Sequence, residues 1–149
     1  MKKFHIGLFI LLICLLINCS LACGTKVSYN YSSYINLATN ADYSEKIIKN
    51  KDELIAFIPD YENDYKLKKY DYYFFEKNYL VFIKHIEHSR LHEYNVKKVL
   101  KSGKTLKIII KIDYSRKVVQ PAFTEVSFIF ELSRDVDINK LEVSFIEVS

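Results

Sequence analysis

Three histidines lie close together in the middle of the chain, with glutamates among them. His85, His88 and His92 follow the spacing i, i+3, i+7, and Glu87 and Glu93 are near neighbours. On one helix this spacing would gather three imidazoles on a single face, and imidazole is a common ligand of Zn²⁺. The flanking residues favour a strand, a turn and a second strand, in which His85 and His92 are cross-strand neighbours within about 5 Å. We therefore expect ordinary surface polar residues and no metal site here, with a metal site built from the three histidines as the alternative.

Other patterns associated with catalysis are missing from the sequence. There is no Gly-x-Ser-x-Gly elbow, and beyond the N-terminal segment the only glycines are Gly24 and Gly103, which excludes a glycine-rich phosphate cradle. The paired carboxylates at residues 60–62 and 135–137 lie in expected loops, where solvated turn acids are common. We therefore expect no enzyme, no bound cofactor and no catalytic residue.

The N-terminus has the order of an export signal. Lys2 and Lys3 precede an apolar run over residues 6–17, and small residues follow at once. This order is typical of a secretory signal peptide, and the run is short for a membrane-spanning helix. We expect residues 1–22 to be a signal peptide and the protein to lie outside the cytoplasm; an uncleaved membrane anchor is the alternative.

Residues 16–24 resemble a bacterial lipobox, in which an apolar residue at −3 and a small residue at −1 precede a cysteine that becomes lipidated. Cys23 follows Ala22 but has a serine at −3, whereas Cys19 has a leucine at −3 but follows Asn18. The resemblance implies lipidation of Cys23, with Cys19 as the alternative, and attachment to the extracytoplasmic face of the cell membrane. Secretion after an ordinary cleavage before Cys23 is the competing interpretation.

The remaining charge does not indicate a nucleic-acid partner. Residues 1–22 carry two lysines and no acid, so their removal lowers the formal net charge from +4 to +2. The densest basic patch, Lys66, Lys68 and Lys69, directly follows the acidic segment 60–64. Mixed patches of this kind are usually solvated faces.

The first part of the mature chain has no clear period. Residues 24–42 are rich in Ser, Tyr and Asn, so we assign residues 23–43 to a tether; an edge strand built from the tyrosines is the alternative. A single domain over residues 44–149 is expected to follow.

This domain should begin with a short strand and one or two short helices. Residues 45–49 form the strand, and Asn50 caps the first helix with Glu53 as the reciprocal partner of a capping box. Asp71 caps one further helical turn over residues 72–76.

Strands dominate the rest of the chain. The expected strands cover residues 79–86, 92–100, 105–114, 123–132 and 141–148. Ser102 and Gly103 form a two-residue turn, residues 115–121 form a loop, and a bulge is expected near Phe145. The fold class is α+β: one or two short helices followed by about five mostly antiparallel strands, in a sandwich or an open barrel.

Alternation of apolar and polar residues is clearest in the third and fourth of these strands. It predicts a core that contains Ile108, Ile110, Val126, Phe128 and Phe130. The same alternation places Lys107, Ser127 and Glu131 on the outward phases. In the second strand, Tyr94, Val96 and Leu100 share one phase.

Residues 70–83, with a double phenylalanine before a "Leu-Val-Phe-Ile" strand, and residues 129–132 resemble small exported bacterial proteins related to the C-terminal domain of the protease-complex subunit PrcB. The resemblance covers roughly residues 45–148. It implies an accessory or binding domain that assembles with an exported protease. The related domains carry a glycine-rich loop where this chain has residues 87–90. A small protease-inhibitor-like β domain, acting through residues 87–90 or 115–121, is the alternative function.

The densest sequence feature is aromatic. Its members are Tyr61, Tyr65, Tyr70, Tyr72, Tyr73, Phe74 and Phe75. Such a set either packs helical turns onto the sheet or forms a surface for a partner, because tyrosine buries a large area at low entropic cost.

Overall fold

The structure is a computed structural model that describes residues 24–37, 43–58, 66–87, 90–119 and 124–148. The expected signal peptide, both candidate lipidation sites Cys19 and Cys23, and the candidate metal ligand His88 lie outside these residues. Within the described part of the chain, no helix has both the length and the apolar composition needed to cross a bilayer.

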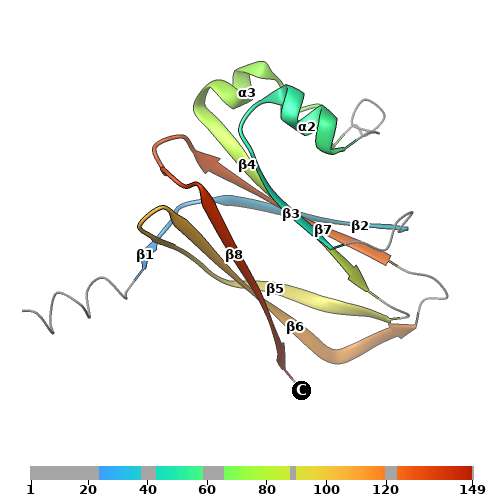
Figure 1. The fold of residues 1–149 in the computed structure, drawn as a ribbon. Helices are drawn as coiled ribbons and strands as arrows, with labels where there is room; N and C mark the ends of the chain where they lie inside the picture. The colour runs from blue at the N-terminus through green and yellow to red at the C-terminus, as the bar shows by residue number, and fades with distance from the viewer. Residues whose placement is uncertain (1–23, 38–42, 59–65, 88–89, 120–123, 149) are drawn as a thin grey trace, which may run out of the picture.

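The described chain is mostly β structure in two four-stranded sheets. One sheet has the order β1 (Thr25–Lys26), β5 (Arg90–Ser102), β6 (Thr105–Val119), β8 (Lys140–Val148). The other has the order β2 (Asn30–Leu37), β7 (Thr124–Ser133), β4 (Asn78–Glu87), β3 (Ser44–Ile48). The sheets face each other, and the short helices α2 (Lys51–Phe57) and α3 (Tyr72–Lys77) lie over the outer face of the second sheet (Figure 1). The sandwich and both short helices agree with the sequence analysis. The described residues form eight strands: the five expected after the helices, the short strand expected before them, and two additional strands at the start of the chain.

The two additional strands come from the segment that we assigned to a tether. β2 pairs antiparallel with β7 from Asn30↔Glu131 to Leu37↔Thr124, and β1 pairs with the end of β5. The ring of Tyr31 lies 5.3 Å from the ring of Phe130, so aromatic packing and ladder hydrogen bonds hold this segment on the sheet. The tether interpretation is wrong for residues 25–37, and the edge-strand alternative is confirmed.

The inter-sheet core is confirmed as predicted. Ile108, Ile110, Val126, Phe128 and Phe130 are each at most 2 % exposed and belong to one apolar cluster between the sheets. Lys107 is exposed on the outer face of its strand, as expected.

A second apolar cluster lies between the helices and the outer face of the β2-β7-β4-β3 sheet. It includes Leu54 of α2, Phe75 of α3, and Leu80 and Ile129 of the central strands. Because this layer covers β7 and β4 on their second face, both strands are buried on both sides. Ser127 lies on the outward phase of β7, as expected, but this face is covered: its side chain is buried and donates a hydrogen bond to Glu125.

The helix starts follow the expected caps. The backbone N–H of Glu53 donates to Oδ1 of Asn50 at 2.8 Å, and the Glu53 carboxylate accepts from the backbone N–H of Lys49 at 2.8 Å. The backbone N–H of Phe74 donates to Oδ1 of Asp71 at 2.9 Å. Both caps satisfy amide groups that the first helical turn leaves without partners.

The path of the chain differs from hairpin order at two places. β4 and β5 are consecutive strands but lie in different sheets, so they do not form a hairpin with each other. β8 pairs parallel to β6, since β7 between them lies in the other sheet and the chain returns in its original direction. The sheets are otherwise antiparallel.

Local irregularities also fall at other positions than expected. β8 keeps a regular register through Phe145, whereas β5 has register shifts at Leu91/Glu93 and Val96/Lys98. The second shift changes the phase of the strand, so Val99 rather than Leu100 enters the core.

Two boundaries move by a few residues. Ser102 pairs with Thr105, so the hairpin turn consists of Gly103 and Lys104, with Gly103 at φ 58°, a conformation that favours glycine. β6 continues to Val119, and the expected loop at 115–121 therefore begins later.

Candidate functional site

A buried carboxylate lies at the end of β4, on the face that points between the sheets. The residue Glu87 is only 9 % exposed. Its Oε1 accepts a hydrogen bond from the hydroxyl of Tyr94 and lies 3.2 Å from Nε2 of His85. Its Oε2 lies 3.7 Å from Nε2 of His92. We call Glu87, His85, His92 and Tyr94 the Glu87 cluster.

The crossing from one sheet to the other brings these side chains together. His85 and Glu87 are on β4, whereas His92 and Tyr94 are on β5 of the opposite sheet. The histidines therefore meet across the end of the sandwich, and the expectation that they are neighbours in one hairpin is wrong.

Aromatic rings enclose both imidazoles. The His85 ring stacks on Phe145 of β8 with centroids 4.4 Å apart, and the His92 ring contacts Tyr114 of β6 at 4.2 Å. Burial, together with the adjacent Glu87 carboxylate, raises the pKa of the Tyr94 phenol above its usual value. Tyr94 is therefore a protonated donor to Glu87 at neutral pH.

One atom of the cluster lacks a partner. The His92 side chain is 5 % exposed, and its Nδ1 is buried without a hydrogen-bond partner in the described part of the chain. A buried polar atom in this state is unusual, since leaving it unpaired costs about 1–3 kcal/mol. The Glu87 cluster is therefore incompletely satisfied.

The structure does not test the three-histidine metal site, because its candidate ligand His88 lies outside the described residues. Among the described residues, no group of three or more His, Cys, Asp or Glu side chains has the arrangement to hold a metal ion. His85 and His92 instead both approach the carboxylate of Glu87.

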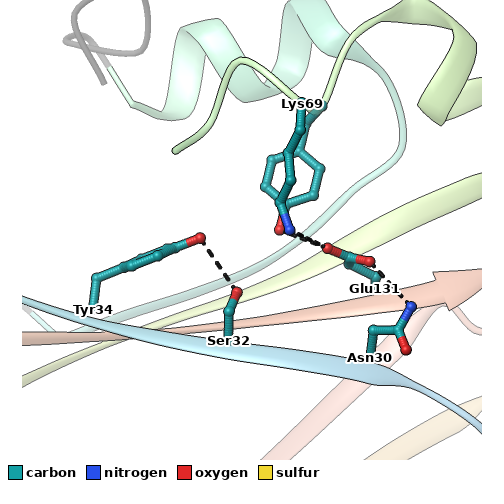
Figure 2. Close-up of polar contacts among 6 residues, drawn as sticks. Asn30, Ser32, Tyr34, Lys69 and Glu131 are labelled. Carbon is teal, nitrogen blue, oxygen red and sulfur yellow. Dashed lines mark hydrogen bonds and ion pairs between the residues drawn. The ribbon is translucent and has the colours of Figure 1, made fainter. Parts of the chain in front are cut away.

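A second carboxylate cluster lies on the helix-facing side of the β2-β7-β4-β3 sheet (Figure 2). Oε1 of Glu131 accepts from Nζ of Lys69 at 2.7 Å and from the hydroxyl of Tyr70 at 2.9 Å. Oε2 accepts from the Asn30 side chain at 3.3 Å. Partial burial opposes the charged form, but the hydrogen bonds from Lys69 and Tyr70 outweigh it and lower the pKa of Glu131. We call Glu131, Lys69, Tyr70 and Asn30 the Glu131 cluster; it ties β2 and the segment before α3 to β7.

The aromatic set divides into packed and exposed members. Tyr70 and Phe75 are buried and Phe74 packs against the same helix-side cluster. Tyr72 and Tyr73 are 60 % and 78 % exposed on α3. Tyr61 and Tyr65 lie outside the described residues.

The exposed pair is partly held in place by α2. Nζ of Lys51 lies 4.8 Å from the centre of the Tyr72 ring, and the Tyr72 hydroxyl donates to Asp52 at 3.3 Å. The nearby Asp52 carboxylate also raises the pKa of the Tyr72 phenol. Tyr72 and Tyr73 form what we call the tyrosine pair.

Sequence reasoning missed the roles of Glu131 and Arg134. Nε of Arg134 donates to the carbonyl of Phe75 at 2.7 Å, and its NH2 group donates to the carbonyl of Lys49 at 2.8 Å. These contacts join the connection after β7 to the ends of α3 and β3. The acceptors are main-chain carbonyls far away in sequence, so no local residue pattern predicts these contacts.

Comparisons with protein-family models, with curated proteins and with solved structures found no match to this chain. The resemblance to the C-terminal domain of PrcB therefore stays a hypothesis from the sequence.

Proposed function

We propose that this protein is a non-catalytic binding domain, held at the extracytoplasmic face of a membrane by its N-terminus, that assembles with an exported protein such as a protease. Lipidation of Cys23 provides the attachment, with Cys19 as the alternative site. The sequence order of an export signal and the PrcB-like segments support the location and the class of partner.

The observation that carries the binding role is the exposure of the tyrosine pair. Tyr72 and Tyr73 remain largely exposed, although their neighbours Tyr70 and Phe75 are buried in the same turn of chain. Tyrosine is enriched in protein interfaces because its ring supplies a large contact area and its hydroxyl a hydrogen bond. The contacts from Lys51 and Asp52 also restrict the Tyr72 ring before a partner arrives, which lowers the entropic cost of binding.

Attachment is tested by expressing the full-length chain in bacteria with a clickable fatty acid. We expect label in the membrane fraction, and we expect Cys23→Ser to remove the label and release the protein. Label that survives Cys23→Ser but disappears in Cys19→Ser would move the attachment to Cys19. Absence of label in the parent protein would contradict lipidation.

Binding is tested by cross-linking the exported full-length protein to its neighbours in its native cells. Tyr72→Ala/Tyr73→Ala should lose the cross-linked partner, whereas Tyr43→Ala, which removes another exposed tyrosine, should retain it. Equal capture by both variants would contradict the assignment of the tyrosine pair.

A stoichiometric inhibition assay against exported proteases separates the alternative. Inhibition that depends on residues 87–90 or 115–121 would favour a protease-inhibitor-like domain over an accessory domain.

A further inference from the structure

A hollow of about 570 Å³ opens beside the short pairing of β1 with β5. Three lysines line it: Lys26, Lys97 and Lys98. Its floor and walls are apolar or aromatic, with Tyr29, Val99 and Leu100. No acidic side chain is among the described residues that line it, so the hollow combines positive charge with an apolar surface.

The irregular register of β5 creates this concentration of charge. The shift between Val96 and Lys98 leaves Lys97 without a partner position on β6. As a result, the neighbouring side chains of Lys97 and Lys98 are both exposed, although successive residues of a regular strand point to opposite faces. None of the three lysines takes part in an ion pair within the described part of the chain.

The chain enters the domain at the same place. Gly24 lines the hollow, and a Cβ at this position would lie 3.1 Å from Cβ of Leu100 and 3.1 Å from the carbonyl oxygen of Lys101. The residue directly before Gly24 is Cys23, and the apolar run 6–17 precedes it. β1 begins at Thr25, so no spacer of the expected tether type separates the N-terminal segment from this surface.

We propose that this hollow, which we call the lysine hollow, faces the membrane and binds the headgroups of anionic phospholipids. The inference rests on the proposed attachment of the N-terminus to a membrane. A domain held at Cys23 keeps Lys26, Lys97 and Lys98 within reach of the lipid surface. Each lysine near an anionic surface strengthens association by about fivefold, and the apolar walls accept the glycerol and upper acyl region. The N-terminal attachment and the lysines together orient the domain on the membrane. In this orientation the helical layer, which carries the tyrosine pair, does not contact the lipid.

The test is lysine footprinting of the full-length chain reconstituted with vesicles. One set of vesicles contains phosphatidylcholine alone, and the other also contains phosphatidylglycerol. An amine-acylating reagent modifies accessible lysines, and mass spectrometry gives the extent of modification at each one. Flotation of the vesicles measures membrane association independently.

We expect modification of Lys97 and Lys98 to fall by about fivefold in the anionic vesicles relative to the neutral ones. Lys68 and Lys77, which are exposed on the helical layer, should react equally in both. High salt should abolish the difference, because it shortens the screening length to about 3 Å at 1 M.

A substitution pair provides the matched control. Lys97→Gln/Lys98→Gln should remove the anionic protection of Lys26, whereas Lys68→Gln/Lys77→Gln should preserve it. Both variants change exposed side chains, so neither should unfold the protein.

The outcomes separate the two proposals. Flotation with both vesicle types but equal modification of Lys97 and Lys98 would overturn the lysine hollow and leave the attachment standing. Flotation and protection with anionic vesicles alone would support the hollow and contradict the N-terminal attachment. Flotation with neither would overturn both.

Discussion

In both the Glu87 cluster and the Glu131 cluster, a glutamate carboxylate accepts a hydrogen bond from a tyrosine hydroxyl, but the other partners of the two carboxylates differ. Glu131 also accepts from Lys69 at 2.7 Å and from Asn30 at 3.3 Å. Glu87 has two imidazoles instead, one at 3.2 Å and one at 3.7 Å, and the buried Nδ1 of His92 finds no partner among the described residues.

This difference indicates that the contacts of the Glu131 cluster stabilise the fold, whereas those of the Glu87 cluster are not accounted for by stability. The Glu131 cluster joins β2, β7 and the chain before α3, and every contact on its carboxylate comes from a donor that suits an anion. The Glu87 cluster packs against the inter-sheet core through Tyr94, but Nδ1 of His92 has no hydrogen-bond partner in the described part of the chain. Stability alone would favour an apolar ring at His92, so this cluster is the polar site to test for function.

The largest expected effect concerns the apolar floor of the Glu87 cluster. The ring of Phe128 lies 5.4 Å from the ring of Tyr94 and is fully buried. Phe128→Ala should lower the free energy of unfolding by about 3–5 kcal/mol through lost burial and a residual cavity. Urea unfolding measures this, with Lys107→Ala as the control at less than about 0.5 kcal/mol. An unchanged midpoint for Phe128→Ala would contradict the strand phase of β7.

The next largest effect is expected for Glu131→Ala, which tests whether the Glu131 cluster stabilises the folded protein. Glu131→Ala leaves the Tyr70 hydroxyl without its acceptor in a part-buried position, and it leaves Lys69 without its ion pair. We expect the free energy of unfolding to fall by about 1–3 kcal/mol. Thermal unfolding of parent and variant at neutral pH measures the change. A loss below the Lys107→Ala control would show that the cluster contributes no stability.

A smaller effect is the pH dependence that this carboxylate confers. The pKa of Glu131 in the folded protein is lowered from 4.5. Its charged form therefore stabilises the fold above pH 4.5, and this contribution is lost as the pH falls through the lowered value. The difference in unfolding free energy between the parent and Glu131→Gln should be constant near neutral pH and should shrink in acid. A difference that grows in acid would mean that the sign of the pKa shift is wrong.

The sequence predicted the features that depend on local rules. The caps at Asn50 and Asp71 and the alternation around Ile108 and Phe128 each follow from a few adjacent residues, and all four are confirmed. The division into two sheets was not predictable in this way, because local patterns do not reveal whether β4 and β5 form a hairpin or cross between sheets.

That limitation explains the outcome for the polar sites. The histidines were identified as a group from their spacing, but their meeting at Glu87 depends on the crossing between sheets. Glu131 was assigned only an outward phase, since its partners Lys69 and Asn30 are distant in sequence. The tether was predicted because residues 24–42 are polar and have no regular period, a pattern that does not reveal that Tyr29 and Tyr31 pack on Phe130 of β7.

The contrast between the two clusters is tested most directly by replacing one cationic or imidazole partner in each. His92→Phe keeps the ring contact with Tyr114 and removes the unpaired Nδ1, so the free energy of unfolding should stay constant or rise by up to about 1 kcal/mol. Lys69→Met removes a half-exposed ion pair to Glu131 and should lower the free energy of unfolding by about 0.5–1 kcal/mol. Parallel urea unfolding at neutral pH gives both values. A larger loss for His92→Phe than for Lys69→Met would contradict the account, because it would make the Glu87 cluster the stabilising one.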